Sequence, residues 1–395
     1  MSDFSRFTPQ LDRRSFLKTT GLVGAAALAG SFAPFSALAA DGTVTIADIG
    51  VGDPGGDWSK FKAATGKDVN LVSIGNAPSA VVNQLLAGGG QKTFDLINIV
   101  GGMQKPLAEA DLIEVIDTSK MPNFAKNTYI DTYLAEGSPG FDFIGYDGTL
   151  YGVPTVLQAD SFGYLPDKTG EIDSYGAFFD PKFKGFVALE DNYTTTGQKT
   201  ALYLKANKLV DIEDPGDMTP SELKSVIDFL IEKKKEGQFR LIWSGFEQGV
   251  NLLTSQEIYV MDCWEPMVFV ARDKGVNVKY ASPKEGYLLW AMAAYLVNNP
   301  DRSEEETDAA YALLDFMLGP WYGAKITGMR GYMTNPMAAE YAAAHPDEFS
   351  KEEAEKIAAI DARVKEKFAY GGTWQNRWPT HVEAYEEEWQ RFKAA

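Results

Sequence analysis

Near the end of its first hundred residues the chain reads Phe94-Asp95-Leu96-Ile97-Asn98-Ile99, an apolar run with almost no polar alternation. Such a run is typical of a strand buried on both faces, as in a parallel sheet. Upstream, the sequence predicts strands over 43–49 and 69–74 and helices over 60–64 and 79–87. Strands and helices that alternate at this spacing predict an α/β lobe with a parallel sheet.

A second group of elements follows further along the chain. The segment Thr219-Pro220-Ser221-Glu222 predicts a helix start, because Thr219 can cap the helix and Glu222 can reach back to the cap amide. Ser350 and Glu353 form the same pattern before a helix over 350–368. Other predicted elements are strands over 186–189, 240–243, 257–264 and 288–297 and a helix over 303–318.

A chain of 395 residues is too long for one simple core and suits two lobes. We predict an α/β protein with a ligand cleft between its lobes. The expected division is a leader over 1–39, the first part of lobe 1 over 40–154, lobe 2 over 155–284, a return segment of lobe 1 over 285–335, and a C-terminal helical segment over 336–395 that packs on lobe 2.

The first forty residues have the three parts of an export signal. The adjacent Arg13 and Arg14 precede an apolar stretch over 21–38, and Ala37-Leu38-Ala39 supplies small residues for cleavage. Paired arginines favour the twin-arginine route, so we expect a periplasmic protein that folds before export. The alternative is an uncleaved anchor, but the stretch contains Pro34 and is rich in Gly and Ala. No later stretch is apolar for as long, so we expect the mature protein not to be inserted in a membrane.

Composition excludes several classes of function. The formal net charge of −18 disfavours nucleic acid and anionic membranes as partners, and it favours cationic ligands weakly. Cys263 is the single cysteine and lies in an apolar run, so a buried packing role is expected. The two histidines, His345 and His381, and the lack of any hydrolase or metal motif predict a protein that is not an enzyme and holds no cofactor or metal.

One motif keeps an enzymatic alternative open. The segment Gly50-Val51-Gly52-Asp53-Pro54-Gly55 follows a predicted strand and matches the GxGxxG pattern of dinucleotide-binding proteins. Pro54 and Gly56 leave little room for a helix start aimed at a pyrophosphate, and the second strand has no acidic residue at its end. A glycine-rich turn at the edge of a cleft is the favoured interpretation, and a twin-arginine-exported, nucleotide-dependent oxidoreductase is the alternative.

Carboxylates and indoles gather at predicted strand ends, where ligands bind in open α/β sheets. An indole face attracts an ammonium group, and a carboxylate adds a charge-assisted hydrogen bond. We therefore expect a site for a small organic amine. Its candidate residues from these strands are Asp160, Asp191, Trp243, Trp264, Glu265 and Trp290, with Glu190 beside Asp191.

Several motifs resemble the solute-binding proteins of bacterial ABC transporters, specifically the spermidine/putrescine-binding branch. They are Phe61 to Val69, Tyr151-Gly152-Val153-Pro154, Phe183-Lys184-Gly185, Pro283-Lys284-Glu285-Gly286 with Trp290, Gly331-Tyr332-Met333-Thr334-Asn335-Pro336 and Trp374-Gln375-Asn376. The resemblance implies a periplasmic-binding-protein type II-like fold, ligand capture by cleft closure, and an inner-membrane ABC permease as partner. We expect a monomer.

The ligand residues of that family match only in part. Where the family has aromatic residues in its first loop, this chain has Asp48-Ile49-Gly50. Asp191, Trp264 and Trp290 keep the second-lobe half of the polyamine pattern. We therefore expect a polyamine-like or shorter amine, with Asp48 and Tyr332 completing the site. Arg330 could receive a carboxylate, so a zwitterion such as an amino-acid conjugate or opine remains an alternative.

Overall fold

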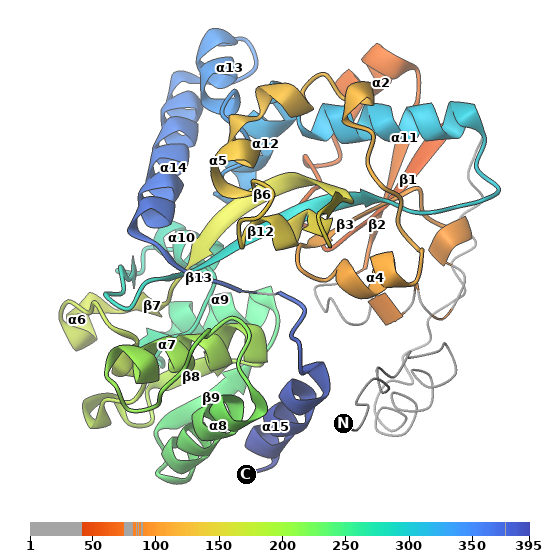
Figure 1. Cartoon of the computed structure of the whole chain (residues 1–395). Coiled ribbons are helices and arrows are strands. Elements are labelled where there is room, and N and C mark those ends of the chain that lie inside the picture. The colour runs from red at the N-terminus through yellow and green to blue at the C-terminus, as the bar shows by residue number, and fades with distance from the viewer. Residues whose placement is uncertain (1–41, 75–81, 84, 86, 88–89, 376) are drawn as a thin grey trace, which may run out of the picture. The chain divides into compact units, whose positions relative to one another are not determined.

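Two separate β-sheets organise the chain (Figure 1). The computed structural model describes residues 42–74, 82–83, 85, 87, 90–375 and 377–395, all within the unit Ala39–Ala395. The predicted leader, most of the predicted helix over 79–87, and Asn376 of the last family-like motif lie outside the described residues.

The six-stranded sheet forms the first lobe. Its strands are β1 (Thr43–Asp48), β2 (Asp68–Ser73), β3 (Leu96–Val100), β6 (Gly152–Asp160), β12 (Tyr287–Leu296) and β13 (Gly372–Trp374). The strand β1 lies parallel between β2 and β3, as the apolar runs predict, while β12 runs antiparallel to both β3 and β6. All residues of β12 are buried, and its side chains belong largely to the main apolar core.

The five-stranded sheet forms the second lobe. Its strands follow the order β11 (Lys279–Tyr280), β7 (Gly163–Tyr164), β10 (Val260–Met261), β8 (Val187–Glu190) and β9 (Phe239–Trp243). The strands β8, β9 and β10 are mutually parallel where they pair. A short hairpin of β4 (Gly145–Tyr146) and β5 (Thr149–Leu150) stands apart from both sheets. The sequence predicts a strand over 257–264, whereas the corresponding strand β10 spans only Val260–Met261.

Helices cover both sheets. In the first lobe they are α2 (Ser59–Thr65), α4 (Lys105–Glu109), α5 (Thr128–Tyr133), α11 (Glu304–Met317), α12 (Pro320–Arg330), α13 (Ala338–Ala344) and α14 (Lys351–Tyr370). In the second lobe they are α6 (Pro166–Thr169), α7 (Gln198–Ala206), α8 (Pro220–Lys235), α9 (Phe246–Ser255), α10 (Glu265–Asp273) and α15 (Val382–Ala394). The predicted capping boxes before α8 and α14 are both present, because each cap hydroxyl and each glutamate bonds the other residue's backbone amide.

The border between the lobes lies later than position 154. The strand β6 continues to Asp160 within the first sheet, so the chain enters the second lobe only after that residue. Pro154 lies where the register of β6 against β12 shifts, beside the bulged Thr155. A proline lacks an N–H and is tolerated at such irregular positions of a sheet. Tyr151-Gly152-Val153-Pro154 thus opens a first-lobe strand and not the second lobe.

The C-terminal segment divides between the lobes, which differs from the expectation that all of 336–395 packs on lobe 2. The helices α13 and α14 pack against α12, and Ile357 and Val364 of α14 belong to the first-lobe core. The helix α15 instead packs on the second lobe, where Tyr385 and Phe392 lie in the core beside α8. Among the described residues, no helix has the length and apolar character needed to cross a membrane.

Candidate ligand-binding site

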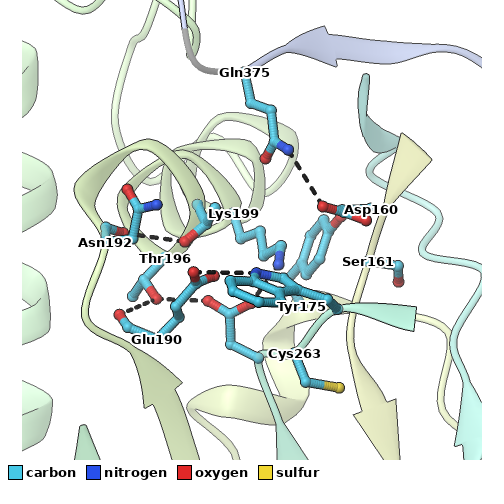
Figure 2. A network of polar contacts seen from close by, with 12 residues as sticks. Asp160, Ser161, Tyr175, Glu190, Asn192, Thr196, Lys199, Cys263 and Gln375 are labelled. Carbon is cyan, nitrogen blue, oxygen red and sulfur yellow. Dashed lines mark hydrogen bonds and ion pairs between the residues drawn. The ribbon is translucent and has the colours of Figure 1, made fainter. Parts of the chain in front are cut away.

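Three strands of the two sheets bring acidic side chains together at their carboxyl ends (Figure 2). Asp160 is the last residue of β6, Glu190 is the last residue of β8, and Asp262 directly follows β10. Because β8 and β10 are parallel neighbours, their carboxyl ends lie at the same edge of the second sheet. We call Asp160, Glu190, Asp262 and Lys199 the acid–lysine cluster.

Asp160 is almost fully enclosed, with a relative exposure of 4%. The amide Nε2 of Gln375 donates to its Oδ2 at 3.3 Å, and the Tyr280 hydroxyl lies 3.5 Å from its Oδ1. Burial raises the pKa of Asp160, whereas the positive charges of Lys199 and Lys367 lower it. The sequence-predicted carboxylate is therefore a buried charge that depends on neighbouring cations and donors.

Glu190 is the second buried acid. The indole Nε1 of Trp264 donates to its Oε1 at 3.1 Å, while its Oε2 is buried and has no hydrogen-bond partner among the described residues. Burial and the Asp262 carboxylate raise the pKa of Glu190 to about 8, and Lys199 opposes that shift. A buried acceptor of this kind is unusual unless a ligand or ordered water satisfies it.

Lys199 and Asp262 complete the cluster, and the sequence analysis missed both. Lys199 forms an ion pair with Asp262, and neither side chain is exposed. The Thr196 hydroxyl donates to Oδ2 of Asp262 at 2.5 Å. Asp262 could have been noticed because it follows a strand end as Glu190 does. Lys199 lies inside a helix, and nothing in its local sequence signals that it points into the protein.

Trp290 and Tyr332 join Asp160 from the first lobe. Their rings meet edge to face, with centroids 5.4 Å apart and planes at 75°. A hydrogen bond from Trp290 also lowers the pKa of Asp160, so the buried indole N–H is directed at that carboxylate. Burial and the charge of Asp160 raise the pKa of Tyr332, and the charge of Arg330 lowers it. The structure thus brings together three residues that the sequence predicted, with Arg330 close enough to influence one of them.

Glu265 has cationic partners within the protein. Its carboxylate, which is 1% exposed, pairs with Arg363 and, at 2.8 Å, with Nζ of Lys367. Both bases belong to α14 of the first lobe, whereas Glu265 begins α10 of the second. Burial and the nearby Arg363 lower the pKa of Lys367. This carboxylate is therefore already neutralised by a bridge between the lobes, which does not fit the expectation that it binds the ligand.

Asp191 and Trp243 do not join the cluster as ligand-facing groups. Asp191 is exposed, and its carboxylate accepts the indole N–H of Trp389 of α15 at 2.8 Å. Trp243 is fully buried in the second-lobe core and donates to the backbone oxygen of Asp262 at 2.8 Å. Trp243 instead supports Trp264, against which its ring packs edge to face at 5.7 Å. The expectation that Asp191 binds the ligand therefore does not fit the structure, because its carboxylate is already hydrogen-bonded to Trp389 of α15.

Asp48 organises the glycine-rich turn that follows β1. Its carboxylate accepts the amides of Gly50 at 2.6 Å and Gly52 at 3.1 Å, and it accepts Nδ2 of Asn98 at 2.6 Å. Burial raises the pKa of Asp48, while these donors lower it. A Cβ on Gly52 would lie 2.4 Å from the same carboxylate, so only glycine fits there. The backbone amides of Gly50 and Gly52, which would have to bind the pyrophosphate of a dinucleotide, donate to Asp48 instead.

The described residues include no group of three or more His, Cys, Asp or Glu side chains arranged to hold a metal ion. Cys263 is buried, and burial raises the pKa of its thiol. A buried protonated thiol is a poor nucleophile. Of its neighbours in the chain, Asp262 belongs to the acid–lysine cluster and Trp264 donates to Glu190 of that cluster.

Comparison with known proteins identifies the family and the export signal. Residues 58–358 match the family described as bacterial extracellular solute-binding protein, and residues 10–30 match the signal sequence of the twin-arginine translocation pathway. The "Spermidine/putrescine-binding periplasmic protein 1" of Haemophilus influenzae is 23% identical over 345 residues, which are 87% of this chain and 86% of that protein.

Two solved structures show the same fold. A putative spermidine/putrescine ABC transporter protein from Listeria monocytogenes superposes with a TM-score of 0.67 and 21% identity, covering 89% of this chain and 99% of the other. The PBP MotA from A. tumefaciens B6, in complex with glucopine, gives a TM-score of 0.66 and 19% identity over 89% and 99% of the two chains. The predicted type II-like binding-protein fold is thereby confirmed.

The twin-arginine signal and the periplasmic relatives together confirm the predicted export to the periplasm. The family match covers well over half of the chain. This protein belongs to the bacterial extracellular solute-binding protein family, as the periplasmic solute-binding component of an ABC importer.

Proposed function

We propose that the captured solute is a small organic amine held between the lobes by the strand-end carboxylates and indoles. The observation that carries this proposal is the pair Asp160 and Glu190, two buried carboxyl groups beside the indoles of Trp290 and Trp264. A carboxylate together with an aromatic face is the combination that recognises an ammonium group. The relative from Haemophilus influenzae, which is named a spermidine/putrescine-binding protein, supports an amine as the ligand class.

Capture would proceed without chemistry on the ligand. The chain crosses between the sheets after Asp160, before Tyr287 and after Trp374, and short crossings of this kind act as hinges. Ligand bound in the open form would draw the lobes together, and the closed form would dock on a membrane permease. The bridge from Glu265 to Lys367, which joins the lobes in this structure, would stabilise the closed form.

A zwitterion is the second candidate, because of Arg330. The Arg330 Nε is buried without a hydrogen-bond partner among the described residues, and its charge influences Tyr332 beside Trp290. A ligand with both an ammonium and a carboxylate group could bind Asp160 and Arg330 at once. The similarity in fold to MotA, which was solved with glucopine, supports testing this class.

A thermal-shift screen tests the proposal directly. Putrescine, spermidine, γ-aminobutyrate and glucopine would each be added to the mature protein, with glucose and glutarate as ligands that lack an amine. A ligand present at about 100 times its Kd stabilises the folded state by about 2.7 kcal/mol, which is a readily measured shift. Stabilisation by an amine supports the proposal, and stabilisation by glucose or glutarate alone would overturn it.

A further inference from the structure

Lys199 is a cation enclosed among acids in the site where an amine is proposed to bind. It lies in the first turn of α7, its side chain is fully buried, and its ammonium group pairs with Asp262 (Figure 2). The other oxygen of Asp262 accepts from Thr196 at 2.5 Å. Asp262 is thus satisfied by the protein itself and has no need of a ligand.

The charge of Lys199 also acts on the two remaining acids of the cluster. Burial alone lowers the pKa of Lys199, but Asp262, Asp160 and Glu190 more than offset this and raise it, so the side chain stays cationic. In turn, Lys199 lowers the pKa of both Asp160 and Glu190. One ammonium group of the protein therefore already lies within the field of three carboxyl groups.

Some buried polar atoms at and beside the cluster are left unsatisfied by the described part of the protein. Buried atoms without a hydrogen-bond partner among the described residues are Oε2 of Glu190, Oε1 of Gln375 and Oγ of Ser161. Two of these residues are neighbours of Asp160, since Gln375 donates to that carboxylate and Ser161 follows it in the chain, and the charge of Asp160 acts on Glu190. Unsatisfied buried polar atoms in a native site point to a bound ligand or water.

We infer that Lys199 is a built-in counter-cation that determines the charge of the ligand. Lys199 already supplies one ammonium group among the three acids, so the site accepts an amine that presents a single ammonium group and discriminates against polycations. The physical reason is that like charges repel strongly where water is excluded. This inference rests on the proposed function, since it names the amine class that the same site takes.

A matched pair of ligands isolates the effect of the second ammonium group. Butylamine and putrescine have the same four-carbon chain, and only putrescine carries two ammonium groups at pH 7. Titration calorimetry on the mature protein gives both Kd values. The wild-type protein is expected to bind butylamine at least as tightly as putrescine. Tighter binding of putrescine by about tenfold or more would overturn the inference and leave an amine-binding function intact. Binding of neither amine, nor of any amine in the screen above, would overturn the proposed function and the inference together.

Lys199→Met tests the residue itself, and Lys205→Met is its matched control on the exposed face of the same helix. The preference for putrescine over butylamine should rise about tenfold in K199M, because a repulsive charge is gone, and should not change in K205M. An unchanged preference in K199M would assign Lys199 a purely structural role and overturn the inference.

Urea unfolding shows whether K199M folds, because it leaves Asp262 buried without its cation. If it does not fold, Asp262→Asn supplies the test. This variant keeps Lys199 but removes a carboxylate, so the preference should shift further toward butylamine. No shift in D262N would likewise overturn the inference.

Discussion

The indole of Trp264 donates to Oε1 of Glu190 at 3.1 Å, which joins the start of α10 to the end of β8. The same ring packs against Trp243 and Phe246, so its position is fixed before any ligand arrives. A rigid aromatic surface beside a carboxyl group lowers the entropic cost of binding. This relationship makes Trp264 the residue whose replacement should affect ligand binding most selectively.

Trp264→Ala should weaken the binding of the tightest amine of the screen by about 1 to 3 kcal/mol, combining lost burial and cation–π attraction. Trp264→Phe keeps an aromatic face and should lose less. Calorimetry measures both. Trp389→Phe is the control, because its indole binds Asp191 and lies outside the proposed site. Equal losses of affinity in W264A and W389F would contradict the assignment of Trp264.

Glu190 should make stability depend on pH. Its pKa is about 8 in the folded protein and about 4.5 when unfolded, so the unfolded state binds fewer protons between these values. The free energy of unfolding should therefore fall as pH rises from about 5 to about 8, by at most about 1.4 kcal/mol per pH unit from this group. Urea titrations of the ligand-free protein measure this, and Glu190→Gln should show a shallower fall. Parallel pH profiles for the two proteins would refute the raised pKa.

Glu265→Gln should destabilise the ligand-free protein in the closed arrangement, because Lys367 and Arg363 lose their common partner. Removing one partner of a buried pair costs about 3 kcal/mol. Glu348→Gln is the control, since its pair with Lys60 is largely solvent-accessible and is worth about 1 kcal/mol or less. Midpoints of urea unfolding compare the two variants. A loss in E265Q no larger than that in E348Q would show that the bridge between the lobes contributes little.

Gly52→Ala should disrupt the turn after β1. The added Cβ would lie 2.4 Å from Oδ2 of Asp48 and 2.5 Å from Nδ2 of Asn98, so the turn must shift. Such overpacking costs about 1 to 3 kcal/mol. Gly197→Ala is the control, because that glycine has helical angles and open space around its Cβ position. Thermal unfolding that leaves both variants at the wild-type midpoint would contradict the close packing of the Asp48 turn.

Much of the fold could be predicted from the sequence because its signals are local. The apolar runs of β1 and β3 and the capping boxes of α8 and α14 each specify one element without reference to the rest of the chain. The extent of β6 could not be predicted in this way. Its pairing with β12, more than a hundred residues away, overrides the turn signal of Gly152 and Pro154.

The candidate site was predictable only in part. Asp160 and Trp264 were found because ligands bind beyond strand ends in open α/β sheets, whereas Trp290, inside β12, was marked by the family-like motif that precedes it. The sequence cannot show that α15 and α14 reach across to occupy Asp191 and Glu265, since these contacts span 198 and 102 residues of chain. Lys199 was missed for the same reason, because only tertiary packing turns it toward the acids.

The most direct measurement compares Asp160→Asn with Asp191→Asn by calorimetric titration of the tightest amine of the screen. Both variants remove one negative charge at a strand-end acid, but only Asp160 lies beside Trp290 in the acid–lysine cluster. The account predicts that D160N loses about tenfold or more in affinity, while D191N stays within about twofold of the wild type. Full affinity in D160N, or a large loss in D191N alone, would contradict the proposed site.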